Sequence, residues 1–129
     1  MEESSLYQLI EYFPDFESQL LEINEYMLGQ GLKFKTRFRL PFYYGKTWIA
    51  YLNIPKPKRK KDPSRAELCF VRGIELPSGP TMLDFKGRAM IGGIDISTLD
   101  DQKREIINLL TQEAIELDAT VPYTFKKKK

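Results

Sequence analysis

The fold is decided by residues 32–52, which read LKFKTRFRLPFYYGKTWIAYL. In the first half of this stretch, apolar residues and one threonine occupy alternate positions: Leu32, Phe34, Thr36, Phe38 and Leu40. The positions between them are all cationic: Lys33, Lys35, Arg37 and Arg39. Because successive side chains of a strand point to opposite faces, this alternation predicts a strand with one buried face and one cationic face in contact with water.

The second half of the stretch predicts a partner strand. Pro41 has no N–H group and restricts the residue before it, so we expect regular pairing to end after Leu40. The chain then reverses at Tyr44-Gly45-Lys46, where the glycine supplies backbone freedom. Beyond the turn, one face of the second strand is expected to be apolar, and it carries Trp48, Ala50, Leu52 and Ile54. Residues 32–52 therefore predict a hairpin.

Helical patterns flank a run of short strands on both sides. Apolar residues at helical spacing predict a short helix before Pro14 and a second helix from there to Leu28. Two further strands are expected at 66–72 and 88–96, and a closing helix, capped by Ser97 or Thr98, ends near Asp118. This order predicts an α+β fold: an antiparallel sheet of four to five strands with the N-terminal and C-terminal helices packed on one face.

Length and composition indicate one small domain. The chain has 129 residues, so we expect a single domain at 1–125 and a flexible basic tail at 126–129. No apolar run approaches the length of a membrane helix, and the acidic N-terminus is unlike a secretory signal. Together with the single cysteine, these features predict a cytoplasmic protein without a membrane partner.

Several residue types and motifs that carry chemistry are missing. The sequence contains no histidine, which excludes Ser-His-Asp and Cys-His catalytic groups and the usual zinc sites. It also contains neither a phosphate-binding loop nor a GxGxxG motif. Cys69 lies in the apolar segment ELCFV, which is typical of a small buried residue rather than a nucleophile. We therefore expect a binding protein rather than an enzyme.

The net charge of +2 conceals a strong segregation of charge along the chain. Residues 1–32 carry a net charge of −7 and residues 33–88 a net charge of +10. Residues 89–125 carry a net charge of −5, and the four terminal lysines follow them. An acidic helical part and a basic sheet part would produce this distribution.

Three segments carry a family resemblance. They are LPFYYGKTWIAYL at 40–52, ELCFVRG at 67–73, and KGRAMIGGIDI at 86–96, which is followed by a helix that contains QEAIEL. On these segments the chain resembles the YdhG-like family, bacterial domains of unknown function that include a frataxin-like intracellular iron chaperone. The resemblance implies a small cytoplasmic α+β domain that handles iron, with iron or an iron-acceptor protein as its partner.

The iron interpretation requires a group of carboxylates. The resemblance implies that Asp15, Glu22 and Glu25 on the first long helix would supply hard oxygen ligands for the metal. The neighbouring strand departs from the frataxin pattern, because its alternate residues are cationic and would repel a metal ion.

The cationic strand supports a different hypothesis, which is binding of nucleic acid or another polyanion. The residues that would make this surface are Lys33, Lys35, Arg37, Arg39 and Tyr51, and the loop KPKRKK at 56–61 would extend it. Basic sheets that carry aromatic side chains bind single-stranded nucleic acid, but strand lysines also serve solubility and the protection of sheet edges.

A third hypothesis is a pocket for a small molecule or peptide near the turn of the hairpin. Its residues would be Phe42, Tyr43, Tyr44 and Trp48, with Arg72 as an anchor for an anion. The same aromatic side chains, if exposed, would instead favour a homodimer.

Overall fold

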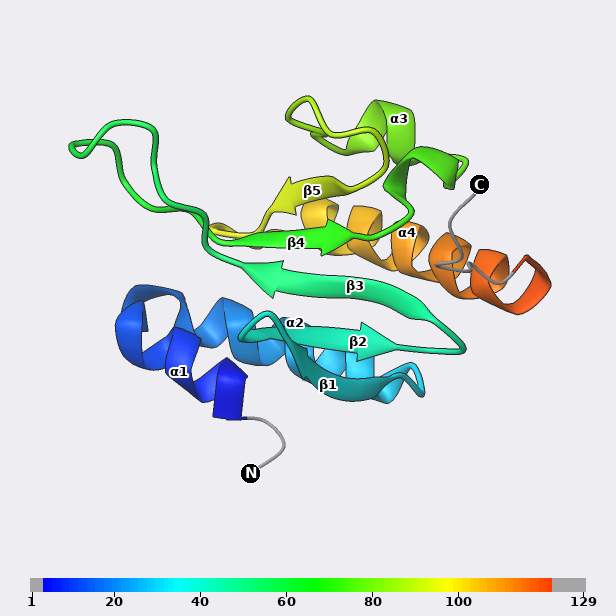
Figure 1. The fold of residues 1–129 in the computed structure, drawn as a ribbon, viewed down its shortest axis with the longest axis horizontal. Coiled ribbons are helices and arrows are strands. Elements are labelled where there is room, and N and C mark those ends of the chain that lie inside the picture. The colour runs from blue at the N-terminus through cyan, green and yellow to red at the C-terminus, as the bar shows by residue number, and fades with distance from the viewer. Residues whose placement is uncertain (1–3, 122–129) are drawn as a thin grey trace.

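A computed structural model describes residues 4–121 (Figure 1). The chain begins with α1 (Ser4–Tyr12), a 3-10 turn η1 (Pro14–Phe16) and α2 (Glu17–Gly29). Four strands follow: β1 (Lys33–Arg37), β2 (Leu40–Tyr44), β3 (Trp48–Asn53) and β4 (Glu67–Phe70). The chain then forms η2 (Gly73–Glu75), α3 (Gly79–Met82), β5 (Gly92–Asp95) and the long α4 (Asp101–Thr120).

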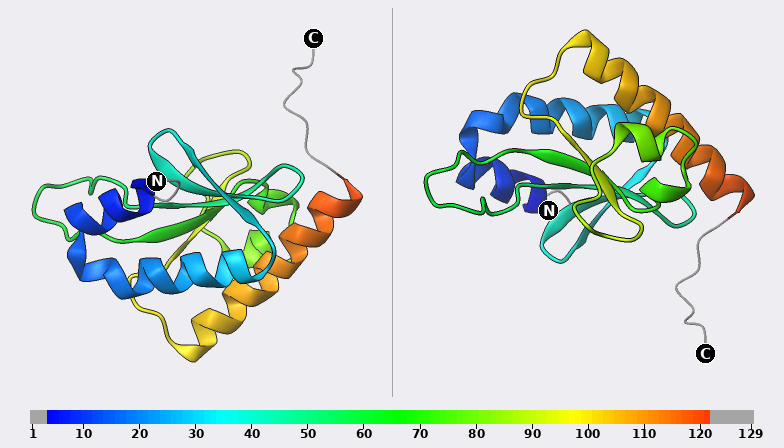
Figure 2. Two further views of the ribbon diagram at one scale, coloured as in Figure 1. Left: turned by 90° about the horizontal axis from the view of Figure 1, so that it is seen from below. Right: turned by 90° about the horizontal axis from the view of Figure 1, so that it is seen from above.

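The five strands form one antiparallel sheet in chain order, β1-β2-β3-β4-β5. The edge-on views show α2 and α4 together on one face of this sheet, whereas the opposite face carries no helix (Figure 2). The prediction of an α+β fold with helices packed on one face of an antiparallel sheet is therefore confirmed. We call the helix-free side of the sheet the open face.

The stretch that decides the fold contains one more turn than the alternation predicts. The first strand ends at Arg37, and Phe38 and Arg39 make a two-residue turn with φ angles of 52° and 63°. The prediction of an unbroken strand to Leu40 is wrong, and Phe38 is 77% exposed instead of buried. Pro41 does not end the pairing, because it lies within β2 opposite Thr36. The stretch therefore forms three strands rather than two.

Within β1 itself, the predicted division into a buried face and a cationic face is correct. Leu32 is buried, and the half-buried Phe34 packs edge-on against the ring of Tyr43 at 5.8 Å between centroids. Lys33, Lys35 and Arg37 are all exposed. The alternation of side chains therefore predicts the orientation of β1, and it fails only where the backbone turns.

A β-bulge in β3 reverses the predicted orientation of one large side chain. Tyr43 pairs with Ala50 but Tyr44 pairs with Trp48, so β3 contains one residue more than β2 over this interval. The extra residue lets Ile49 and Ala50 both join the core, and Trp48 then lies on the open face with Tyr51. The prediction that Trp48 shares a face with Ala50 and Leu52 is therefore wrong.

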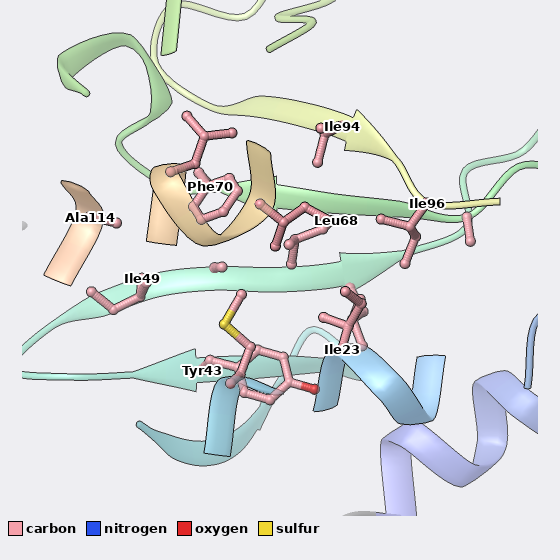
Figure 3. Close-up of a cluster of buried hydrophobic side chains, with 14 of the residues drawn as sticks. Ile23, Tyr43, Ile49, Leu68, Phe70, Ile94, Ile96 and Ala114 are labelled. Atoms are coloured by element: carbon pink, nitrogen blue, oxygen red, sulfur yellow. The ribbon is translucent and has the colours of Figure 1, made fainter. Parts of the chain in front are cut away.

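The core fills the space between the sheet and the helices (Figure 3). Its strand residues include Tyr43, Leu68 and Phe70, which are fully buried, and Ile23 packs against them from α2. The hydroxyl of Tyr43 donates a hydrogen bond to Oδ1 of the buried Asn24 over 2.7 Å, so this polar group is satisfied inside the core. Leu68 and Phe70 both reach this core from β4, so they share one face of the sheet.

The closing helix begins later than predicted and is held by polar side chains. Its N-cap is Asp100 rather than Ser97 or Thr98, and the Asp100 carboxylate accepts a hydrogen bond from the Lys103 N–H over 2.8 Å. Farther along α4, the carboxylate of Glu113 accepts hydrogen bonds from the backbone N–H and the hydroxyl of Ser78. Between residues 4 and 121, none of the helices has both the length and the apolar character needed to cross a membrane.

Candidate functional site

Three exposed cations stand in a row on the open face. Lys33, Lys35 and Arg37 occupy alternate positions of β1, the edge strand of the sheet. In the part of the chain that the structure describes, no acidic side chain lies within ion-pair distance of any of them. Alternate residues of a strand are about 6.6 Å apart, so the three charges form a regular row. Such a row can hold successive phosphates of an extended chain.

Aromatic rings lie beside this row on β2 and β3. The ring of Phe42 stacks on that of Tyr51 with 4.7 Å between centroids and meets Trp48 edge-on at 5.1 Å. Tyr44 also meets Trp48 edge-on, at 4.2 Å. Phe42 and Trp48 are buried within this cluster, whereas Tyr44 and Tyr51 keep part of their surface in contact with water. The cluster exists on this face because the bulge in β3 turns Trp48 toward it.

Cations of β1 lie directly over these rings. The guanidinium of Arg37 is 4.6 Å from the centroid of the Trp48 ring, and the ammonium of Lys35 is 5.4 Å from the centroid of Tyr44. The negative face of an aromatic ring attracts a cation, so these contacts hold both side chains against the sheet. Arg37 and Lys35 nevertheless remain exposed to solvent.

A hollow of about 270 Å³ opens beside the aromatic cluster. Phe42, Trp48 and Tyr51 line it from the sheet. Arg37, Phe38 and Leu40 line it from the β1–β2 hairpin, and Val71 and Ile91 complete it beyond β4 and before β5. Its lining is mostly apolar, so it suits the flat apolar surface of a ring better than a charged group.

A buried polar cluster adjoins Tyr51 on the open face. The Cys69 thiol donates to Oε1 of Glu67 over 3.3 Å, and the Lys86 ammonium lies 2.7 Å from Oε2 of the same carboxylate. Burial and the neighbouring Glu67 raise the pKa of the Cys69 thiol to about 12. Burial and the adjacent Cys69 also raise the pKa of the Tyr51 hydroxyl. Both groups are therefore protonated at neutral pH, and the burial of Cys69 disfavours the thiolate form that a nucleophile requires.

The structure separates some residues that the sequence analysis grouped. Arg39 leaves the cationic row, because the left-handed turn directs it to a different hollow shared with α1. Tyr43 belongs to the core and lies on the opposite face of the sheet from Phe42 and Trp48. The buried Arg72 pairs with Glu75 over 2.7 Å instead of facing the open face. The other residues of the two predicted sites remain together on the open face: Lys33, Lys35, Arg37, Tyr51, Phe42, Tyr44 and Trp48.

The structure does not bring the carboxylates of the iron interpretation, Asp15, Glu22 and Glu25, together into one group. Within residues 4–121 no three histidine, cysteine, aspartate or glutamate side chains gather in a group that could hold a metal ion. Glu22 instead pairs with Arg104 of α4, with 2.6 Å between Oε2 and Nε, and this contact lowers the pKa of the Glu22 carboxyl. Asp15 and Glu25 are exposed to solvent.

The basic loop lies at one end of the open face. Because β1, β2 and β3 are antiparallel, the end of β3 at Asn53 is at the same end of the sheet as the turn at Phe38 (Figure 1). The KPKRKK segment of the loop that leaves β3 carries five exposed cations, Lys56, Lys58, Arg59, Lys60 and Lys61. The basic loop and the hairpin tip therefore lie at the same end of the sheet. The tail at 126–129 lies outside the described residues.

Comparison with known proteins leaves the site to be interpreted from its own geometry. No family model, no curated protein and no solved structure matches the chain. The resemblance to the YdhG-like family therefore stays a prediction.

Four residues of the hollow were missed by the sequence analysis. Phe38 and Leu40 were assigned to the buried face of a strand, and Val71 and Ile91 were assigned no role. No sequence signal marks the turn that exposes the first pair, because Phe38-Arg39 contains neither the asparagine nor the glycine typical of a two-residue hairpin loop. Val71 and Ile91 are twenty residues apart in sequence, and only the pairing of β4 with β5 brings them to the same hollow.

Proposed function

We propose that this protein binds single-stranded nucleic acid through the open face of its sheet. One observation carries the proposal: Lys33, Lys35 and Arg37 form a cationic row, without an ion-pair partner among residues 4–121, directly beside the aromatic cluster and its hollow. Cations that follow a phosphate backbone, next to rings on which bases stack, are the two elements of single-strand recognition.

Duplex nucleic acid suits this surface less well. Bases in a duplex are already stacked on each other, so they cannot use aromatic rings of a protein, whereas unpaired bases can. The rings that remain accessible here are those of Phe38, Tyr44 and Tyr51. They contribute to affinity only when the bound bases are unstacked, so we expect single strands to bind more tightly than duplexes of the same sequence.

The distribution of charge between the helical layer and the sheet also directs a bound nucleic acid to the open face. The helical layer carries exposed acids on α2 and α4, among them Glu25, Glu105 and Glu116. These carboxylates repel phosphates from the helical side, and the cationic row attracts them to the open face. A polyanion therefore approaches the sheet from the side that carries the aromatic cluster.

The metal alternative has weaker support. Iron delivery rests on the family resemblance, and the described residues offer no carboxylate group for the ion. Titration with ferrous iron under anaerobic conditions, with an Asp15/Glu22/Glu25 triple alanine variant as control, remains its test.

Removal of the cationic row is expected to weaken the binding of single-stranded nucleic acid and to reduce the salt dependence of that binding. In a variant with Lys33→Gln, Lys35→Gln and Arg37→Gln, the slope of log affinity against log salt should fall by about 2, because each lost phosphate contact on a single strand accounts for about 0.7. The measurement is fluorescence anisotropy of a labelled single-stranded oligonucleotide at several salt concentrations.

A matched pair of single variants distinguishes specific binding by the cationic row from nonspecific attraction by the total charge. Arg37→Gln and Arg39→Gln change the net charge equally, but only Arg37 lies over Trp48 on the open face. The first should lower affinity more than the second. Equal losses in this pair, together with equal competition by a heparin oligosaccharide, would indicate nonspecific attraction and would contradict the proposal.

A further inference from the structure

The tip of the β1–β2 hairpin has an unusual sequence for its conformation. Phe38 and Arg39 both have positive φ angles, and they form the whole loop between the paired residues Arg37 and Leu40. This is the two-residue hairpin turn in which both central positions are left-handed, and Asn-Gly is its strongly preferred sequence. Phenylalanine and arginine are strained there, because a side chain in this region crowds the backbone. The chain therefore retains a less stable turn than a simple substitution would provide.

The strained phenylalanine is also the most exposed large ring on the open face. Phe38 is 77% exposed, and its ring lies 6.2 Å from that of Phe42 and 5.2 Å from the guanidinium of Arg37. Together with Leu40, it lines the hollow from the hairpin side. Backbone strain that is kept in a structure is concentrated at binding and catalytic sites. An exposed ring on a strained turn at the rim of an apolar hollow indicates a contact with a ligand.

We propose that the hollow receives one unstacked base of a bound single strand, and that Phe38 provides the outer stacking surface for this base. The inference rests on the proposed function and specifies how that site holds its ligand. The apolar lining suits the flat face of a base, and the cation that borders the hollow, Arg37, lies where a neighbouring phosphate would be. The positive charge of Arg37 complements the phosphate backbone to which a base is attached. The hollow therefore favours a base of a nucleic acid over a neutral apolar molecule.

The deciding variants are Phe38→Asn and Arg39→Gly. Both relieve the strain of the turn, because asparagine and glycine adopt the left-handed region readily, so each should raise the melting temperature by about 3 °C. Phe38→Asn removes the stacking ring, whereas Arg39→Gly leaves the hollow intact. A loss of binding in a more stable protein cannot result from misfolding.

Binding is measured with two probes that carry equal numbers of phosphates, a short oligothymidylate and an abasic strand of the same length. Wild-type protein should bind the oligothymidylate roughly tenfold more tightly than the abasic strand, which is within the usual range for stacking of a base. Fluorescence of Trp48, the single tryptophan of the chain, should change with the first probe only. Phe38→Asn should reduce the preference roughly threefold or more, because only Tyr44 and Tyr51 then remain for stacking, and Arg39→Gly should preserve it.

The outcomes distinguish the two proposals. Equal binding of both probes by the wild type, or an unchanged preference in Phe38→Asn, would overturn the stacking role but leave the cationic row as a binding surface. If neither probe binds the wild type at low salt, both the proposed function and the stacking role fail.

Discussion

Replacement of Asp118 by alanine is expected to lower the free energy of unfolding by about 3 kcal/mol, because this buried carboxylate holds the β2–β3 turn. It accepts hydrogen bonds from the Lys46 N–H over 2.5 Å, the Thr47 N–H over 3.0 Å and the Thr47 hydroxyl over 2.6 Å. Hydrogen bonds to a charged acceptor are stronger than neutral ones, and their donors would lose this partner. Urea denaturation monitored by circular dichroism measures the change.

The same contact explains the glycine of the turn. A Cβ atom at Gly45 would lie 2.6 Å from Oδ2 of Asp118, so a side chain there would displace the carboxylate. Trp48 follows Thr47 directly, so Asp118 also fixes the start of the strand that carries the aromatic cluster.

The control for Asp118 lies on the same helix. Glu116 is exposed, and Glu116→Ala should change stability by less than about 0.5 kcal/mol. If Asp118→Ala were as stable as Glu116→Ala, the carboxylate would not anchor the turn.

Replacement of Gly79 by alanine is expected to cost about 3 kcal/mol or more, at the upper end of the usual range for overpacking. A Cβ atom at this buried position would lie 1.8 Å from the carbonyl oxygen of Gly73 and 3.3 Å from the Cβ of Leu76. The obstacle is backbone, which cannot rotate away as a flexible side chain can, so η2 and α3 would have to separate. The measurement is the urea midpoint of the variant against wild type.

A second glycine provides the matched control. Gly29 is the last residue of α2, and a Cβ atom there would meet nothing within 4 Å. Gly29→Ala should therefore stabilise the protein by about 0.5–1 kcal/mol, because alanine is the better helix former. Equal stability of the Gly29→Ala and Gly79→Ala variants would contradict the close approach of the two turns.

The spacing of apolar residues predicted the architecture, because the buried face of each helix or strand determines this spacing locally. The helical stripes before Gly29 and after Asp100 face the core, and the alternation in β1 correctly places its cations on the solvent side. The missed turn at Phe38 has a physical cause. Its residues lack the asparagine and glycine that normally signal a left-handed loop, so the alternation appears to continue through it.

The candidate site was harder to predict because two of its determinants are not local. The bulge that turns Trp48 to the open face depends on the pairing of β2 with β3, and alternation alone puts this side chain in the core. Arg39 continues the cationic pattern in sequence but leaves the row once the chain turns. In contrast, the grouping of Lys33, Lys35 and Arg37 needed only the period of a strand.

Nuclear magnetic resonance titration of the labelled protein with a short single-stranded oligonucleotide tests the central claim most directly. If the open face is the binding surface, the largest shifts should fall on the amides of Lys35 and Arg37 and on the indole N–H of Trp48, while exposed residues of α4 such as Glu105 remain unchanged. Shifts confined to the helical layer, or none at low salt, would contradict the claim.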